Sequence, residues 1–303
     1  MIPPRTFSLA AYLAMAVTAA PMSSAIAQDP TASSTADSTT PMPPSDTIVV
    51  QGHENDRAAI SHQARSFERD VQATPVSGQL ARWHTPICPT VSGIDPAYAD
   101  FFSARIKEIA KNAGIAVGAD TCKPNLFVAF TLDGAALVSA MEKREPRTLS
   151  SEPLAERQLL RTGAQPIRWW YATLLEGGDG GQFSGAGYRA YNDSLIDTGI
   201  RASITGAVVI IDVAHATGYR LDAIASYAAF VALGHFRVGS RPTTAPSILG
   251  VFGPDPATRR ALTAWDRTYL SALYATQPAR RADTQRSRIA GKMAGALANR
   301  PAN

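Results

Sequence analysis

Long apolar runs predict three strands that are buried on both faces of a sheet, at residues 125–131, 167–175 and 207–213. The second run contains Trp169, Trp170 and Tyr171 in succession. Because side chains alternate along a strand, Trp169 and Tyr171 share one face and Trp170 takes the other. One aromatic face left exposed as a contact patch is the alternative. Consecutive aromatic residues nevertheless favour a strand with both faces in the core.

Between and after these strands, apolar residues recur every three or four positions, which predicts helices. The expected helices cover residues 54–71, 134–142, 152–161, 221–233 and 262–274, together with one that begins at Asp95 and Pro96 and ends at Gly114. Thr263 is placed to cap the helix at 262–274, with Asp266 as its partner three residues later. A glycine-rich segment at 177–187 is expected to be a loop.

These elements predict an α+β protein, in which a single domain has a small mixed β-sheet packed by several helices. The domain is expected to cover residues 75–276, because about 200 residues suit one hydrophobic core. A β-prone segment followed by a charged helix precedes it, at 47–74. A basic tail follows at 277–303. Its apolar stripe of Ile289, Met293 and Leu297 is so narrow that a solvated or loosely docked helix is expected.

Residues 1–27 have the pattern of a secretory signal peptide. Arg5 precedes an apolar run, and small residues end in Ala27, so cleavage is expected after Ala27. The run is too short to span a bilayer as a helix, and no later run is long enough. Residues 28–46 are rich in Ser, Thr and Pro and predict a disordered linker. We therefore expect a soluble exported protein, periplasmic or secreted, without a membrane span after cleavage.

Export changes the interpretation of the 2 cysteines in the chain. In an oxidising compartment they predict one disulfide, between Cys88 and Cys122. Free or metal-binding thiols are the alternative, but two sulfur atoms cannot complete a structural zinc site. Closing a loop of this length predicts roughly 3–4 kcal/mol of stabilisation.

The formal net charge of +4 is unevenly distributed along the chain. The tail carries six basic side chains against one acidic side chain, which leaves the folded body mildly acidic. Together with export, this distribution argues against nucleic acid as a partner.

The region from the helix at 221–233 to residue 274 resembles the C-terminal part of zinc metallopeptidases of the metzincin type. Residues 246–249 stand where those enzymes turn beneath the metal. A zinc-binding helix needs two histidines one turn apart, with a glutamate between them. Aligned on Gly234, the histidine positions hold Tyr227 and Val231, and the glutamate position holds Ala228. The resemblance thus implies a degenerate zincin-like frame without metal. An ordinary pair of amphipathic helices is the alternative.

A wider resemblance, over residues 47–274, is to a group of uncharacterised exported proteins of alphaproteobacteria. It rests on the signal peptide, the TIVVQG run, the two-cysteine domain and the LTAWDRTYLSALY helix. This resemblance implies a location and a fold, and it implies no activity.

A short β-prone run before the domain resembles the energy-coupling box of outer-membrane transporters, which adds a strand to the periplasmic protein TonB. Its residues are Asp46, Thr47, Ile48, Val49 and Val50, and the run ends at Gly52. The resemblance implies TonB or another envelope protein as a partner. No pattern of barrel strands follows, and a strand that begins the fold or tethers the linker is the favoured interpretation.

Candidate bases for a different active site are scattered. Asp212 and His215 follow the end of a predicted strand, where functional groups often lie, and they are the candidates for a hydrolase site. His84 is expected to pack beside the disulfide, and Asp222 is a further candidate base. A charged segment is expected on a solvated face, and its glutamates are Glu142, Glu145 and Glu152.

Together these patterns predict an exported, non-catalytic protein that binds a ligand or a partner in the envelope and uses neither a cofactor nor a metal. The alternative is a hydrolase with its site near Asp212 and His215.

Overall fold

A computed structural model describes residues 51–178, 180–181, 198–242, 245–253 and 260–299 of the chain. The chain divides into two units, Met1–Ile48 and Val49–Asn303, and the described residues all belong to the second unit. The predicted signal peptide, the predicted linker and the run Asp46 to Val50 lie outside the described residues, as does most of the glycine-rich loop.

The second unit contains one mixed sheet of five strands, which confirms the predicted α+β domain. The strands are β1 (Arg82–Trp83), β2 (Pro89–Ser92), β3 (Leu126–Thr131), β4 (Ile167–Gly177) and β5 (Ile200–Asp212). Strand β4 runs antiparallel to β5 from Ile200 to Ile211, while β1 and β3 both run parallel to β5. Because β4 occupies one edge of β5, β1 and β3 share the other edge, and β2 extends the sheet beyond β3.

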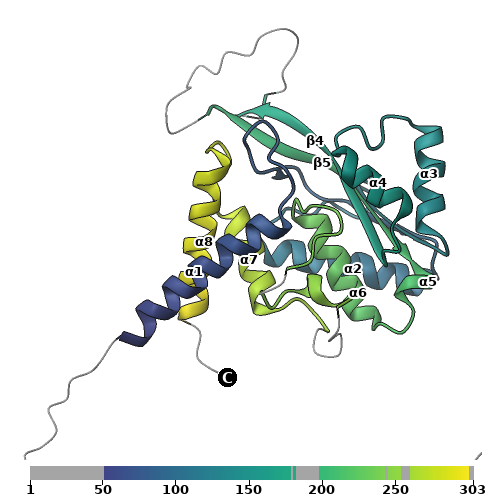
Figure 1. Ribbon diagram of the computed structural model, residues 1–303. Coiled ribbons are helices and arrows are strands. Elements are labelled where there is room, and N and C mark those ends of the chain that lie inside the picture. The colour runs from purple at the N-terminus through teal and green to yellow at the C-terminus, as the bar shows by residue number, and fades with distance from the viewer. Residues whose placement is uncertain (1–50, 179, 182–197, 243–244, 254–259, 300–303) are drawn as a thin grey trace, which may run out of the picture. The chain divides into compact units, whose positions relative to one another are not determined.

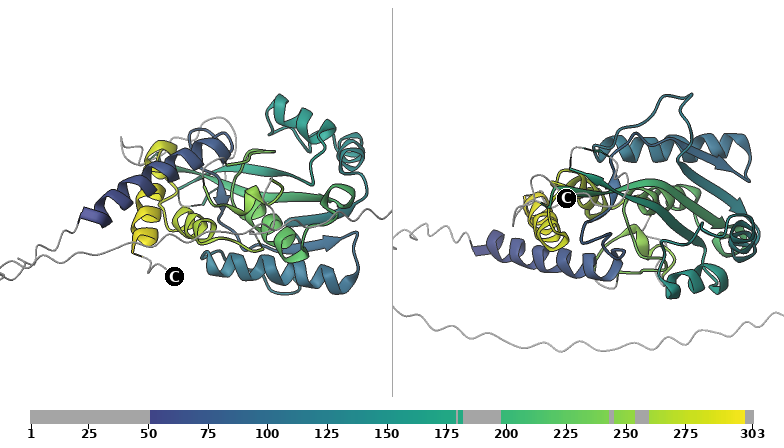
Figure 2. Two further views of the ribbon diagram at one scale, coloured as in Figure 1. Left: turned by 60° about the horizontal axis from the view of Figure 1, so that its bottom comes forward. Right: turned by 90° about the horizontal axis from the view of Figure 1, so that it is seen from above.

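The helices surround this sheet near the predicted positions. They are α1 (Gln51–Val71), α2 (Pro96–Asn112), α3 (Gly134–Arg144), α4 (Leu154–Thr162), α5 (Val213–Ala216), α6 (Leu221–Leu233), α7 (Ala264–Tyr274) and α8 (Ala282–Ala298), with a short 3₁₀ turn at Ile248–Gly250. Figures 1 and 2 show α3 and α4 on one side of the sheet and α2 and α6 on the other. Helices α1, α7 and α8 lie together beyond one end of the sheet.

The three consecutive aromatic residues of β4 divide between two cores as the alternation predicts. Trp169 and Tyr171 belong to the main core, which includes residues of α2, α6 and α7. Trp170 belongs to a smaller cluster on the opposite face, with Val138 of α3 and Leu160 of α4. All three aromatic side chains are buried, so this strand offers no exposed aromatic patch.

The predicted start and stop signals of two helices are confirmed. The side chain of Asp95 caps α2 by accepting the N–H of Ala97 at 2.9 Å, and Gly114, with a φ of +82°, follows the last turn. At α7, Thr263 and Asp266 form a reciprocal capping box. Asp266 also accepts the N–H of Ile248 at 2.8 Å, which ties the 3₁₀ turn to α7.

Two expectations about the ends of the domain are corrected. Helix α1 already includes Gln51 and Gly52, which the sequence pattern assigned to a β-prone run. Helix α8 is not a solvated or loosely docked tail, because Ile289 and Met293 are fully buried in the main core. A partly buried polar contact strengthens this docking, since Arg286 donates to Gln72, the residue after α1, at 2.9 Å. The folded unit is therefore wider than the predicted residues 75–276.

The predicted disulfide is present. Cys88, the residue before β2, is bonded to Cys122, with their Cα atoms 6.0 Å apart. The bond joins the loop that precedes β3 to the edge strand β2. Within the described ranges, no helix combines the length and the apolar character that a bilayer span requires.

Candidate functional site

The structure brings Asp212 and His215 together at the carboxyl ends of the parallel strands β3 and β5. Asp212 is the last residue of β5, opposite Thr131 of β3, and it caps the short helix α5. Its Oδ1 lies 3.0 Å from Nδ1 of His215. The Asp212 side chain is 2% exposed and that of His215 is 45% exposed. The second ring nitrogen of His215 therefore lies on the exposed side of the pair.

The remaining contacts of Asp212 are structural. Its Oδ2 accepts the N–H of Gly134 at 2.9 Å and a guanidinium N–H of the buried Arg168 at 3.2 Å. Arg168 also donates to the carbonyls of Leu160, Gly163 and Gln165 at the end of α4. Burial opposes ionisation of Asp212, yet the hydrogen bonds from Gly134 and His215 leave its pKa below the ordinary value. Among the described residues, no hydroxyl donates to His215.

The other sequence candidates lie apart from this pair. Asp222 is bound by Arg220 at 2.8 Å near the surface. His84 follows β1, and its Nε2 is buried without a described partner. Burial and the neighbouring Arg201 and Arg82 lower the pKa of His84 to about 4.

The positions aligned with zinc ligands lie in the interior of the protein. Tyr227, Ala228 and Val231 are buried in α6. The Val231 carbonyl accepts the Tyr171 hydroxyl at 2.5 Å. Tyr227 lines a small pocket of about 120 Å³ together with Arg241, Gln165 and neighbouring apolar residues. In the part of the chain that the structure describes, no group of three or more His, Cys, Asp or Glu side chains is arranged to hold a metal ion.

A larger cavity of about 400 Å³ lies beside the edge strand β4. It is lined by residues 73–76 of the connection after α1, by residues 151–153 and Glu156 at the start of α4, by Tyr171 and Thr173 of β4, and by His235 after α6. Four segments that are distant in the sequence thus meet around one space, which we call the β4 cavity. Its volume falls within the range of about 300–1,000 Å³ that is typical of ligand sites.

Two buried glutamates form the acidic wall of the β4 cavity. Glu152 is 8% exposed, and its Oε1 accepts the backbone N–H of Tyr171 at 3.3 Å. Glu156 is 6% exposed, and its Oε2 accepts the N–H of Val238 at 3.1 Å. Burial raises the pKa of Glu152 to about 7, and it also raises the pKa of Glu156. Each carboxyl group is therefore held by the backbone on one side only.

The second oxygen of each glutamate is free. Oε2 of Glu152 and Oε1 of Glu156 accept no hydrogen bond from a described residue. Neither atom is among the polar side-chain atoms that are fully buried without a partner. Neither carboxyl group forms an ion pair with a described residue, although two arginines lie near. Arg157 donates instead to the backbone carbonyl of Glu152 at 2.8 Å. Arg237 donates to the backbone carbonyls of Arg69 and Asp70.

His235 and Tyr171 complete the polar part of the cavity. Their rings are in contact, with centroids 5.0 Å apart. Burial lowers the pKa of His235 to about 4, so its imidazole is neutral at neutral pH and offers one acceptor nitrogen. The Tyr171 hydroxyl donates to Val231 and accepts the N–H of Phe236 at 3.1 Å, which fixes the ring. The cavity is thus rich in hydrogen-bond acceptors.

The sequence analysis placed Glu152 wrongly and did not single out Glu156 or His235. Glu142 and Glu145 do lie toward the surface, and Glu142 binds Arg161 at 2.6 Å. Glu152 is buried instead, in the turn before α4, where its carboxyl group accepts the N–H of Tyr171 on β4. The local sequence carries no signal of this burial, because the contact comes from the distant strand β4.

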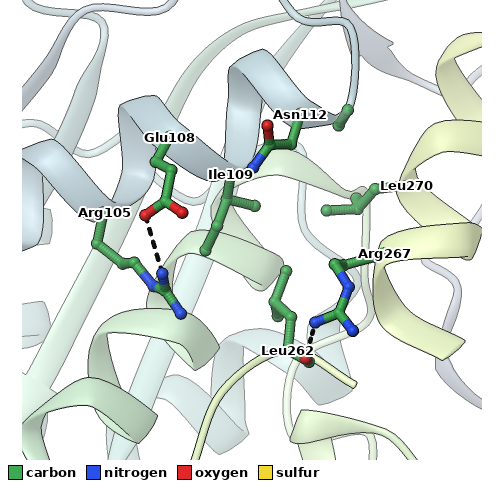
Figure 3. Close-up of a pocket in the computed structure, with 8 residues that line it drawn as sticks. Arg105, Glu108, Ile109, Asn112, Leu262, Arg267 and Leu270 are labelled. Atoms are coloured by element: carbon green, nitrogen blue, oxygen red, sulfur yellow. Dashed lines mark hydrogen bonds and ion pairs between the residues drawn. The ribbon is translucent and has the colours of Figure 1, made fainter. Parts of the chain in front are cut away.

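A different hollow, of about 130 Å³, lies between α2 and α7 and is shown in Figure 3. Its apolar wall consists of Ile109, Ala113, Leu262 and Leu270. Its charged groups are already engaged, since Arg105 pairs with Glu108 at 2.8 Å and Arg267 donates to the carbonyl of Leu262. This hollow is smaller than the β4 cavity and presents no unpaired buried charge, so the β4 cavity is the stronger candidate site.

Comparison with known proteins returned no match, because no family model, no curated protein and no solved structure is significantly similar to this chain.

Proposed function

We propose that the protein is an exported, non-catalytic binding protein whose ligand occupies the β4 cavity. The observation that carries this proposal is that Glu152 and Glu156, buried in the wall of a cavity of about 400 Å³, each accept one backbone hydrogen bond and form no ion pair with a described residue. Buried carboxylates whose charge is not balanced by a cation are costly for folding alone. A bound ligand that completes their hydrogen bonds offsets that cost.

The geometry of the cavity favours binding because its acceptors are fixed in place. Backbone N–H groups anchor both glutamates, and the Tyr171 hydroxyl is bonded twice. A site that is ordered before the ligand arrives loses little conformational entropy on binding.

A ligand screen by thermal unfolding tests this proposal on the chain from Gln28 onward. Ligands of the β4 cavity raise the melting temperature in proportion to their affinity. Thr74 is an exposed residue of the cavity rim with no side-chain hydrogen bond to a described residue, so Thr74→Trp should block entry without loss of folding. Thr121→Trp is the matched control at an exposed threonine elsewhere. We expect at least one compound to raise the melting temperature of the parent protein and of Thr121→Trp. The same compound should leave the melting temperature of Thr74→Trp unchanged. A screen in which Thr74→Trp leaves every response unchanged contradicts the proposal.

The proposed location is the periplasm or the exterior of the cell, after cleavage behind Ala27. The disulfide supports this location, because such bonds persist in oxidising compartments. Sequencing of the mature N-terminus after expression with the leader should give Gln28 in the periplasm or the medium. An uncleaved chain in the cytosol contradicts export.

A hydrolase is the second candidate, and the contact between Asp212 and His215 favours it. An imidazole held by a carboxylate through Nδ1 presents Nε2 as a base. Labelling by hydrolase-directed probes that is abolished by His215→Ala would support this function, and the same labelling of both chains would refute it.

A further inference from the structure

We infer that the ligand of the β4 cavity is a small organic cation that donates N–H groups to Glu152 and Glu156. This inference rests on the proposed binding function and names the chemical class of its ligand. The starting observation is an imbalance, because the cavity wall presents free acceptor atoms and no described cation is paired with them.

The free oxygens of Glu152 and Glu156 need donors that the protein does not supply. The two neighbouring arginines are committed to backbone carbonyls, Arg157 to that of Glu152 and Arg237 to those of Arg69 and Asp70. Neutral His235 lines the same cavity and carries one acceptor nitrogen and one N–H. An ammonium or guanidinium group carries several N–H donors and a positive charge, so it satisfies such a wall. An anionic ligand would oppose ionisation of the two carboxyl groups, whereas a cation favours it.

The remaining wall of the cavity selects an organic cation over a bare metal ion. Apolar side chains of Ala73, Pro75, Val76 and Pro153 line it, together with the rings of Tyr171 and His235. Carbon surface of this kind packs against an alkyl or aryl body. The described residues include no group arranged as a metal site. A cavity of about 400 Å³ also exceeds the space that a single ion needs.

Titration calorimetry with probes of one skeleton tests the inference on the mature chain. Tyramine carries an ammonium group, tyrosol replaces it by a hydroxyl, and 4-hydroxyphenylacetate carries a carboxylate. Agmatine adds a guanidinium probe, and calcium and magnesium chlorides test a metal alone. We expect tyramine or agmatine to bind, with the neutral and anionic analogues at least about tenfold weaker.

Two substitutions and one control locate the binding. Glu152→Gln and Glu156→Gln should each weaken amine binding by about 10- to 100-fold, because each removes a charged hydrogen bond in a buried site. Glutamine keeps an acceptor for the N–H of Tyr171 or Val238, and thermal unfolding without ligand checks that both variants fold. Glu145→Gln, at an exposed glutamate that does not line the β4 cavity, should bind as the parent does.

The outcomes separate this inference from the function on which it rests. Equal binding of tyrosol or 4-hydroxyphenylacetate, or amine binding that survives both glutamine substitutions, overturns the cation inference. So does the failure of both amines to bind. If the wider screen then finds an acidic or neutral ligand that Thr74→Trp excludes, the binding function stands and only the class is wrong. If Thr74→Trp responds to every compound as the parent does, the proposed binding function is wrong as well.

Discussion

Oε1 of Glu152 accepts the backbone N–H of Tyr171 at 3.3 Å, on the edge of β4 that faces away from β5. This bond places the buried carboxyl group of a residue that lines the β4 cavity where a further strand would otherwise pair. The free edge of β4 therefore ends the sheet and anchors Glu152, whose carboxyl group can accept a hydrogen bond from a ligand.

The affinity for an amine should increase with pH. In the empty cavity burial raises the pKa of Glu152 to about 7, so the group is largely protonated below pH 6. A bound cation favours the ionised form, and each mole of ligand then releases up to one proton. Binding should strengthen by up to about tenfold per pH unit between pH 5 and 7 and level off above pH 8. The other titratable or charged side chains around the two glutamates include His235, Arg157 and Arg237.

Calorimetry of tyramine in buffers of different ionisation enthalpy measures this proton release directly. Glu152→Gln should remove most of the pH slope. A slope that is unchanged in this variant contradicts the role of Glu152.

A buried carboxyl group outside the β4 cavity, that of Glu68, should make the protein less stable as the pH rises. Glu68 of α1 is 1% exposed, and neither of its oxygens has a hydrogen-bond partner. Burial raises its pKa to about 8, against the attraction of Arg286, Arg65 and Arg69. The folded state keeps a proton that the unfolded chain has lost, so stability is full below pH 4.5 and is lost as the pH rises toward 8.

Glu68→Gln should therefore stabilise the protein at pH 8, by about 1–3 kcal/mol. Urea unfolding at pH 5 and pH 8 gives the measurement, and the exposed Glu145→Gln is the control. A variant that is less stable than the parent at pH 8 would show that ionised Glu68 is favourably paired.

Asp212 should matter more to folding than His215 does. Asp212→Ala leaves the buried guanidinium of Arg168 without its counter-ion, which should cost about 3 kcal/mol or more in the free energy of unfolding. His215→Ala removes a half-exposed ring and should change stability by about 0.5 kcal/mol or less. A double substitution of Arg168 and Asp212 by leucine should cost less than the sum of the single changes. Additive losses contradict the pairing.

The disulfide should stabilise the fold through the loop that it closes. Substitution of Cys88 and Cys122 by serine should lower the free energy of unfolding by roughly 3–4 kcal/mol. Equilibrium unfolding of the oxidised parent and the double variant compares the two. Equal stability of the two proteins would contradict this prediction. It would mean that strain in the folded state cancels the entropy that the bond removes from the unfolded chain.

The strands and helices could be predicted from the sequence wherever a repeating pattern was long. The apolar runs identified β3, β4 and β5, and the alternation in Trp169, Trp170 and Tyr171 assigned the two faces. Strands β1 and β2 have only 2 and 4 residues, too few for a period to emerge. Helix α8 appeared solvated because its burial depends on α1 and α7, which supply the opposing surface.

The site could be predicted only in part, because it is assembled by tertiary contacts. The proximity of Asp212 to His215 follows from a short spacing at a strand end, and the structure shows it. Glu152 stands in a charged segment, and local composition therefore suggested exposure. Its burial depends on the edge of β4 and on residues 73–76, which are distant in sequence.

A crystal structure of the mature protein with tyramine tests the central claim most directly. We predict that the amine nitrogen lies within hydrogen-bond distance of the free oxygens of Glu152 and Glu156, with the ring against Tyr171 and His235. Density for the amine only at the hollow between α2 and α7, or an empty β4 cavity in a crystal saturated with the compound, contradicts the account.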